Sequence, residues 1–166
     1  MDSVNESLQS APADLLERFR AGQQSALAQA ISLVENERPS SQSFLHELLE
    51  AGSRSATRIG LTGPPGAGKS SLIAMLGTNF RAQEKKLGVV AVDPTSQYSG
   101  GALLGDRIRM SELATDPEIF IRSMATRGSL GGLAATTREV LDLMDAFGFD
   151  TILVETVGVG QTELEI

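Results

Sequence analysis

A glycine-rich loop lies between a predicted strand and a predicted helix near residue 60. Residues 63–70, with the sequence GPPGAGKS, fit the pattern G-x-x-x-x-G-K-[ST], and residues 58–62 before them read as a short buried strand. Loops of this pattern enclose phosphate groups when a strand leads into them and a helix follows. The motif therefore restricts the chain to α/β folds with strand, loop and helix in this order.

The composition of the loop suits a polyphosphate ligand. Glycines can adopt positive φ angles, so that backbone N–H groups converge on the phosphates, while two prolines lower the entropy lost when the loop orders. We expect Lys69 to reach the β- and γ-phosphates and the Ser70 hydroxyl to bind Mg²⁺ at the positive end of the following helix. The residues predicted to bind nucleotide are Gly63, Pro64, Pro65, Gly66, Ala67, Gly68, Lys69, Ser70 and Ser71.

Strands and helices alternate along the rest of the chain. Apolar runs predict strands near 58–62, 87–92, 119–123 and 151–155, and helical periodicity predicts helices near 69–80, 101–114 and 131–146. Alternation of this kind predicts a parallel β-sheet flanked by helices, which with the loop defines a P-loop NTPase. Ligands of such sheets bind at the carboxyl ends of the strands.

The first part of the chain is predicted to be helical. Apolar residues recur at helical spacing up to about Gly52, and breaks at Gly22 and at residues 37–40 divide the pattern into three helices. Two interpretations stay open: an arm that packs on a partner or a second subunit, and a helical prefix that covers the core. The expected domains are an N-terminal helical segment over 1–54 and a P-loop domain over 55–166.

Composition excludes several classes of function. The 166 residues, 41% of them hydrophobic, suffice for one globular domain with an appendage, and a net charge of −7 without a Lys/Arg run argues against nucleic acid or an anionic membrane as partner. The absence of cysteine excludes disulfides and thiolate chemistry. With no signal peptide and no apolar run long enough to span a bilayer, we expect a soluble, cytoplasmic protein; in a eukaryote the mitochondrial matrix would be the alternative, although no transit peptide is seen.

Acidic residues follow two of the predicted strands. Glu155 ends the strand at 151–155, where a carboxylate can hold Mg²⁺ directly or through water, and the N–H of Gly158 could face the γ-phosphate and sense its loss. Asp93 follows the strand at 87–92, although a turn role beside Pro94 is the alternative. Asp106 by itself reads as a solvated surface residue.

Five motifs together resemble one family of GTPases. Residues 61–70, 92–96, 99–110, 126–132 and 154–163 are similar, in order, to the methylmalonyl-CoA mutase-associated GTPase chaperones, whose members have also been described as lysine/arginine/ornithine transport-system kinases. The resemblance implies a homodimeric, Mg²⁺-dependent GTPase. Its partner would be an adenosylcobalamin-dependent acyl-CoA mutase, which it would assist in cofactor loading and protect from inactivation.

The resemblance also assigns roles within the site. Lys69, Glu155 and Gly158 are the expected catalytic residues, and Gln161 matches a mobile switch segment. Glutamate at position 155 replaces the aspartate usual in the third GTPase motif. The expected metal-site residues are Ser70, Asp93, Asp106 and Glu155.

The family places its base-reading loop and its dimerisation segment beyond the third motif, whereas this sequence ends at Ile166. We therefore expect a truncated domain with an incomplete sheet that is marginally folded by itself. An ATP-dependent kinase or ATPase linked to amino-acid transport is one alternative function, and a nucleotide-dependent binding module without hydrolysis is another. A nickel-inserting GTPase is disfavoured because zero cysteines and one histidine provide few metal ligands.

Overall fold

The computed structural model divides the chain into two compact units, which are described separately. One comprises Met1–Ser55 with Arg138–Gly148, and the other Ala56–Thr137 with Phe149–Ile166. No helix in the described part of the chain has the length and apolar character needed to cross a membrane. The structure describes residues 13–36, 44–48, 55–64, 66–93, 113–125 and 130–156.

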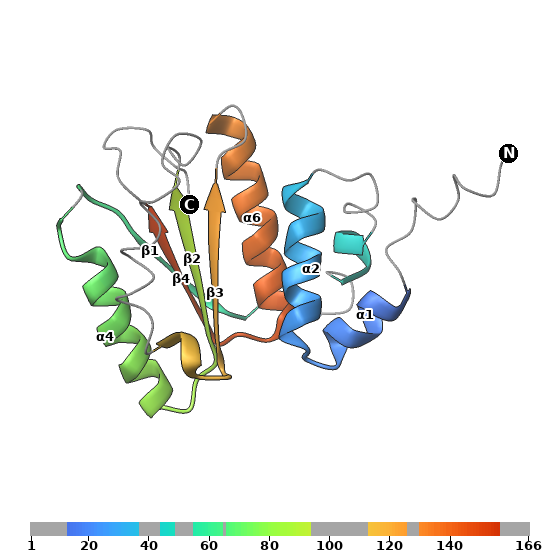
Figure 1. The fold of residues 1–166 in the computed structure, drawn as a ribbon, viewed down its shortest axis with the longest axis horizontal. Coiled ribbons are helices and arrows are strands. Elements are labelled where there is room, and N and C mark those ends of the chain that lie inside the picture. The colour runs from blue at the N-terminus through green and yellow to red at the C-terminus, as the bar shows by residue number, and fades with distance from the viewer. Residues whose placement is uncertain are drawn as a thin grey trace, which may run out of the picture. The chain divides into compact units, whose positions relative to one another are not determined.

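The second unit contains the predicted parallel sheet (Figure 1). Its described strands are β1 (Thr57–Leu61), β2 (Leu87–Asp93), β3 (Ile119–Ala125) and β4 (Thr151–Thr156). They pair in parallel in the order β1-β4-β2-β3, so the last strand in sequence lies between the first two. The four predicted strands are thereby confirmed, each beginning within one residue of its expected start.

The predicted helices after β1 and β3 are also present. They are α4 (Lys69–Ala82) and α6 (Leu130–Phe147). Most of the helix predicted near 101–114 lies outside the described residues, and its last two residues belong instead to a short 3-10 helix, η2 (Leu113–Thr115). Proline disfavours α-helical backbone in the residue before it, so Pro117 accounts for the end of the helical turn before Asp116.

One face of the sheet forms the apolar core beneath α4. The strand register aligns Ile59, Leu153, Val89 and Ile121 in a single row across all four strands. Because side chains alternate between the two faces of a strand, residues two positions further along project from the same face. Ile73 of α4 is fully buried against this face.

The turn after α4 contains the one described non-glycine residue with a positive φ angle. Glu84 has φ 60°. Its N–H donates to the carbonyl of Arg81 (2.9 Å), and the N–H of Lys85 donates to the carbonyl of Phe80 (3.1 Å). This is the Schellman arrangement, in which glycine normally occupies the left-handed position. The same arrangement ends α1 (Ala13–Arg20), where Gly22 holds that position with φ 74°.

Glu84→Gly is expected to stabilise the second unit. Glycine adopts the left-handed conformation without the clash between Cβ and the carbonyl, so we expect a net gain of about 0.5–1 kcal/mol after the greater entropy of the unfolded chain is subtracted. Thermal unfolding of the ligand-free chain measures the effect. Glu84→Ala is the matched control, since it removes the same carboxylate but keeps Cβ; equal stability of the two variants would contradict the assignment of strain.

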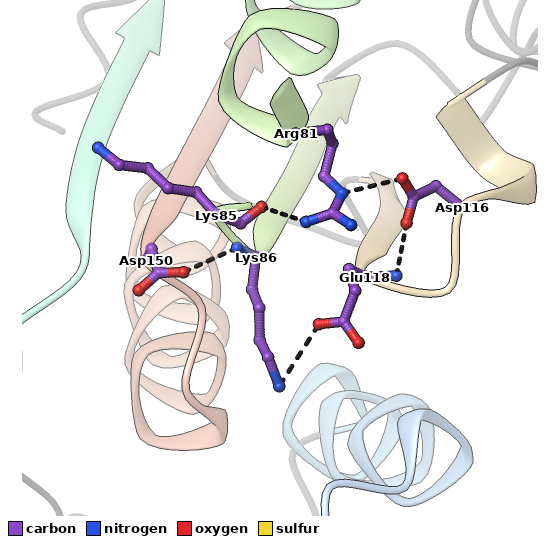
Figure 2. A network of polar contacts seen from close by, with 6 residues as sticks. All are labelled: Arg81, Lys85, Lys86, Asp116, Glu118 and Asp150. Carbon is purple, nitrogen blue, oxygen red and sulfur yellow. Dashed lines mark hydrogen bonds and ion pairs between the residues drawn. The ribbon is translucent and has the colours of Figure 1, made fainter. Parts of the chain in front are cut away.

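A polar network joins the loops at the amino ends of the strands (Figure 2). Arg81 Nε lies 2.9 Å from Asp116 Oδ2, and Asp116 Oδ1 accepts the N–H of Glu118 at 2.8 Å. The Lys86 N–H donates to Asp150 Oδ2 at 2.7 Å, and Lys86 Nζ lies 3.4 Å from Glu118 Oε2. The network connects the segments that precede β2, β3 and β4 and so aligns the starts of these strands.

The Arg81–Asp116 pair is expected to make stability depend on pH. Hydrogen bonds from the Arg81 side chain and from the Glu118 backbone hold the pKa of Asp116 below its ordinary value of 3.8. A depressed pKa contributes stability that is complete above the unfolded value and disappears as the pH falls through the lower, folded value. Asp116→Asn should therefore differ from wild type in its urea midpoint at about pH 7 and converge with it in acid. Arg81→Met should show the same convergence; a difference independent of pH would exclude this origin.

The first unit is helical, as its periodicity predicts. It contains α1 (Ala13–Arg20), α2 (Gln24–Glu35), a helical turn at residues 44–48 and the second half of α6. Phe19 packs edge-on against Phe44 and Phe147, with ring centroids 6.3 and 5.1 Å apart. The buried apolar residues of the three N-terminal helices are Leu15, Phe19, Ala26, Leu27, Ala30, Ile31, Val34, Phe44 and Leu48.

Candidate functional site

The glycine-rich loop leads from the carboxyl end of β1 into the first turn of α4. Gly66 and Gly68 have φ angles of 79° and 85°, a region in which an added Cβ would be strained although neither position has an atom within 4 Å of it. Backbone conformation, rather than lack of space, therefore requires glycine here. Gly68 is the N-cap of α4, so the free amides and the positive end of the helix dipole lie beside the loop.

The side chain of Lys69 folds back over the loop. Its Nζ donates to the carbonyls of Gly63 (2.9 Å) and Pro64 (3.0 Å). The ammonium group is thus held at the loop by two backbone acceptors rather than extended into solvent. This arrangement places a positive charge where the loop amides would converge on an anion.

A buried hydrogen bond connects the start of α4 to the end of β4. The Ser70 hydroxyl donates to Glu155 Oε1 at 2.8 Å, and the two residues are 8% and 2% exposed. Both residues were predicted from the sequence as metal ligands, but their contact with one another was not predicted. Their separation of 85 residues carries no local signal of the contact.

Some of the other predicted site residues belong to the described part of the chain, and some do not. Asp93 is the last residue of β2, which lies between β4 and β3, and it is paired with Ala125 of β3; only its backbone belongs to the described part. Ser71 is exposed on the first turn of α4. The predicted residues that lie outside the described residues are Pro65, Asp106, Gly158 and Gln161.

The donor atoms of Ser70 and Glu155 fit a magnesium ion. Mg²⁺ prefers hydroxyl, carboxylate, phosphate and water oxygens, and it usually takes only one or two ligands from the protein. Within the described ranges no group of three or more His, Cys, Asp or Glu side chains gathers around a point. A site of two protein oxygens completed by phosphate and water is compatible with that arrangement.

The parallel sheet, the loop and the buried Ser–Glu pair beneath it define the P-loop NTPase class. A solved structure described as LAO/AO transport system kinase superposes with a TM-score of 0.66 at 34% identity, covering 89% of this chain and 43% of that chain. The profile of the family "Methylmalonyl Co-A mutase-associated GTPase MeaB" matches residues 27–166. The chain belongs to this family.

Three curated relatives show how widely the family is distributed. A Pyrococcus abyssi protein described as an inferred GTPase is 50% identical over 153 residues, which cover 92% of this chain and 47% of the relative. GTPase ArgK of Escherichia coli is 42% identical over 157 residues, covering 93% and 47%. The mouse protein named methylmalonic aciduria type A homolog, mitochondrial, is 45% identical over 158 residues, covering 87% and 38%. The chain thus spans about half the length of the curated relatives it matches.

Proposed function

We propose that this chain is the phosphate-binding half of a Mg²⁺-dependent GTPase that assists an adenosylcobalamin-dependent acyl-CoA mutase in cofactor loading and protection. Membership of the mutase-associated GTPase family supports the partner class. The buried Ser70–Glu155 pair directly behind the loop is the observation that carries the nucleotide site. Location in the cytoplasm, or in the mitochondrial matrix of a eukaryote, and a homodimeric full-length protein belong to the same proposal.

The residues of the loop would provide most of the contacts to the phosphates. Backbone amides between Gly63 and Ser70 would surround the phosphates, and Lys69 would exchange its two carbonyl partners for the β- and γ-phosphate oxygens. When bound, Mg²⁺ would neutralise negative charge that develops on these oxygens during hydrolysis. Ser70 and Glu155 would hold it, with Asp93 and Asp106 as further acidic positions.

Hydrolysis requires an attacking water in line with the leaving group. No described side chain beside the loop provides a strong general base for that water, so we expect slow intrinsic turnover that a partner or a switch rearrangement accelerates. Gly158 and Gln161 are the proposed switch positions. Bound mutase is the partner that we expect to change the rate.

Calorimetry on the purified chain tests the nucleotide assignment. With Mg²⁺ present, GDP and a non-hydrolysable GTP analogue are titrated into the protein, and an ATP analogue is titrated in parallel. We expect Mg²⁺-dependent binding of all three, because the phosphate loop does not itself read the base. Absence of binding by every nucleotide would contradict the proposed function of this chain.

The transport-kinase description of the solved relative motivates a second arm of the experiment. A full-length relative, such as the E. coli protein, is titrated with GTP and ATP in competition. Preference for GTP supports the GTPase assignment, whereas preference for ATP would support an ATP-dependent kinase. Nucleotide affinity without phosphate release would instead indicate a binding module.

A further inference from the structure

Gly77 lies where α4 comes close to η2 and to the start of β2. A Cβ at this position would meet Leu113 Cδ1 at 2.8 Å, Leu113 Cδ2 at 3.1 Å and Leu87 Cδ2 at 3.3 Å. Carbon atoms pack at about 3.5–4.0 Å, so all three distances are too short. Gly77 is buried within the helix, where propensity alone would favour alanine. Close approach, rather than backbone conformation, is therefore what requires glycine here.

The two leucines have no room to turn away from an added methyl group. Leu87 is fully buried, and Leu113 is 8% exposed in the same apolar cluster as Ile73. Both terminal methyl groups of Leu113 face residue 77, so a rotation that exchanges them leaves the overlap in place. Close packing of the cluster offers neither side chain a space into which to retreat. A side chain at position 77 would therefore push α4 away from the sheet.

The last turn of α4 is held, so such a push would tilt the helix. Arg81 donates through Nε to Asp116 Oδ2 at 2.9 Å and through Nη1 to the carbonyl of Lys85 at 2.8 Å (Figure 2). Along the helix axis, Gly77 lies about 6 Å from Arg81, and Lys69, the first residue of α4, lies about 18 Å from it. A displacement at Gly77 is thus enlarged about threefold at the loop, where a shift of about 0.3 Å becomes about 1 Å.

We propose that Gly77 is a positioning residue for the glycine-rich loop, because it lets α4 lie close enough to the sheet for the loop amides to converge on phosphate. The inference rests on the proposed function, since phosphate binding by the loop is what it would serve. Gly68, the N-cap of α4, joins the loop directly to the helix. A displacement of about 1 Å exceeds the range of about 0.5 Å over which N–H···O distances vary. Amides that converge on one phosphate would then no longer all reach it.

The GDP affinity of Gly77→Ala, measured by calorimetry with Mg²⁺ present, tests the proposal. We expect the affinity to fall about tenfold or more, although alanine is the better helix former. Ile73→Val is the matched control, since it removes a buried methylene group from the same cluster without pushing the helix. Its affinity should stay within about twofold of wild type. Wild-type affinity in Gly77→Ala, or the same loss in Ile73→Val, would overturn the inference.

Shortening Leu113 provides a readout that a loss of stability cannot imitate. Leu113→Ala removes both methyl groups that meet residue 77, whereas the longer contact to Leu87 remains. We therefore expect the double variant Gly77→Ala/Leu113→Ala to bind GDP within about threefold of Leu113→Ala alone. Each substitution by itself disturbs the core, so a purely structural role predicts that the double variant is the weakest binder. Losses that add in the double variant would contradict the proposal.

Far-UV circular dichroism and thermal unfolding without nucleotide verify that each variant is folded. If Gly77→Ala is unfolded by itself, Leu113→Val and Leu113→Ala are compared in its background. Shortening the side chain at position 113 should then raise GDP affinity, and it should not do so where Gly77 is kept; absence of this difference would overturn the inference. A wild-type chain that binds no GDP would contradict the proposed function and the inference with it. That failure is distinguishable, since it alone affects the wild type.

Discussion

Lys69→Ala is expected to abolish hydrolysis and to weaken GDP binding by about one to two orders of magnitude. A charged hydrogen bond to a ligand contributes about 1.5–3 kcal/mol, and the ammonium also offsets negative charge that increases in the transition state. In the ligand-free chain, Lys69 Nζ already lies at the loop, 2.9 Å from the carbonyl of Gly63. Its charge therefore needs little rearrangement to meet a phosphate.

Calorimetry measures the affinity, and phosphate release measures turnover in a full-length relative with the equivalent substitution. Lys86→Ala is the matched control, since it removes the same charge from a residue that precedes β2, at the amino ends of the strands, where Lys86 Nζ pairs with Glu118. That variant should bind GDP as wild type does. Unaltered affinity and turnover in Lys69→Ala would contradict the assignment of the loop.

Ile73→Ala should cause the largest loss of stability among simple truncations of α4. Ile73 is fully buried in the cluster beneath the helix, in which Leu153 and Val89 of the sheet also lie. Replacing a buried isoleucine with alanine costs about 2–5 kcal/mol, because apolar burial is lost and a cavity remains. Typical domains are stable by only about 5–15 kcal/mol, so this loss would remove a large part of the free energy of unfolding.

Urea unfolding measures the loss, and Met75→Ala on the same helix is its control. Met75 is 71% exposed, and truncation there should change the free energy of unfolding by less than about 0.5 kcal/mol. The comparison holds helix propensity nearly constant, since both variants place alanine in the helix. Similar losses in the two variants would mean that α4 does not pack on the sheet as described.

Local structure was largely predictable from the sequence. The four strands, α4 and α6 were found at nearly their observed bounds because their signals are periodic and short in range. The glycine-rich loop was predictable for the same reason, since its fixed spacing places Lys69 and Ser70 at the start of a helix. The sequence pattern did not reveal Glu84 as a left-handed residue, because glutamate at that position carries none of the usual turn signal.

The candidate site was predictable in its members but not in its contacts. Motifs predicted Lys69, Ser70 and Glu155 as site residues, but they did not predict the hydrogen-bond partners of these side chains. Lys69 folds onto two loop carbonyls, and Ser70 donates directly to Glu155. Such contacts depend on side-chain conformations and on distances between elements that are remote in sequence.

Residue spacing within short segments was enough to identify the class of protein, the family and the positions of the loop and strands, because these signals are local. The folded chain was needed to learn that β4 lies between β1 and β2, with Glu155 beneath the first turn of α4. Strand order results from burial of apolar faces that are far apart in the chain, as in the row from Ile59 to Ile121. That nonlocal packing is what brings a carboxylate and a hydroxyl from distant segments to one point.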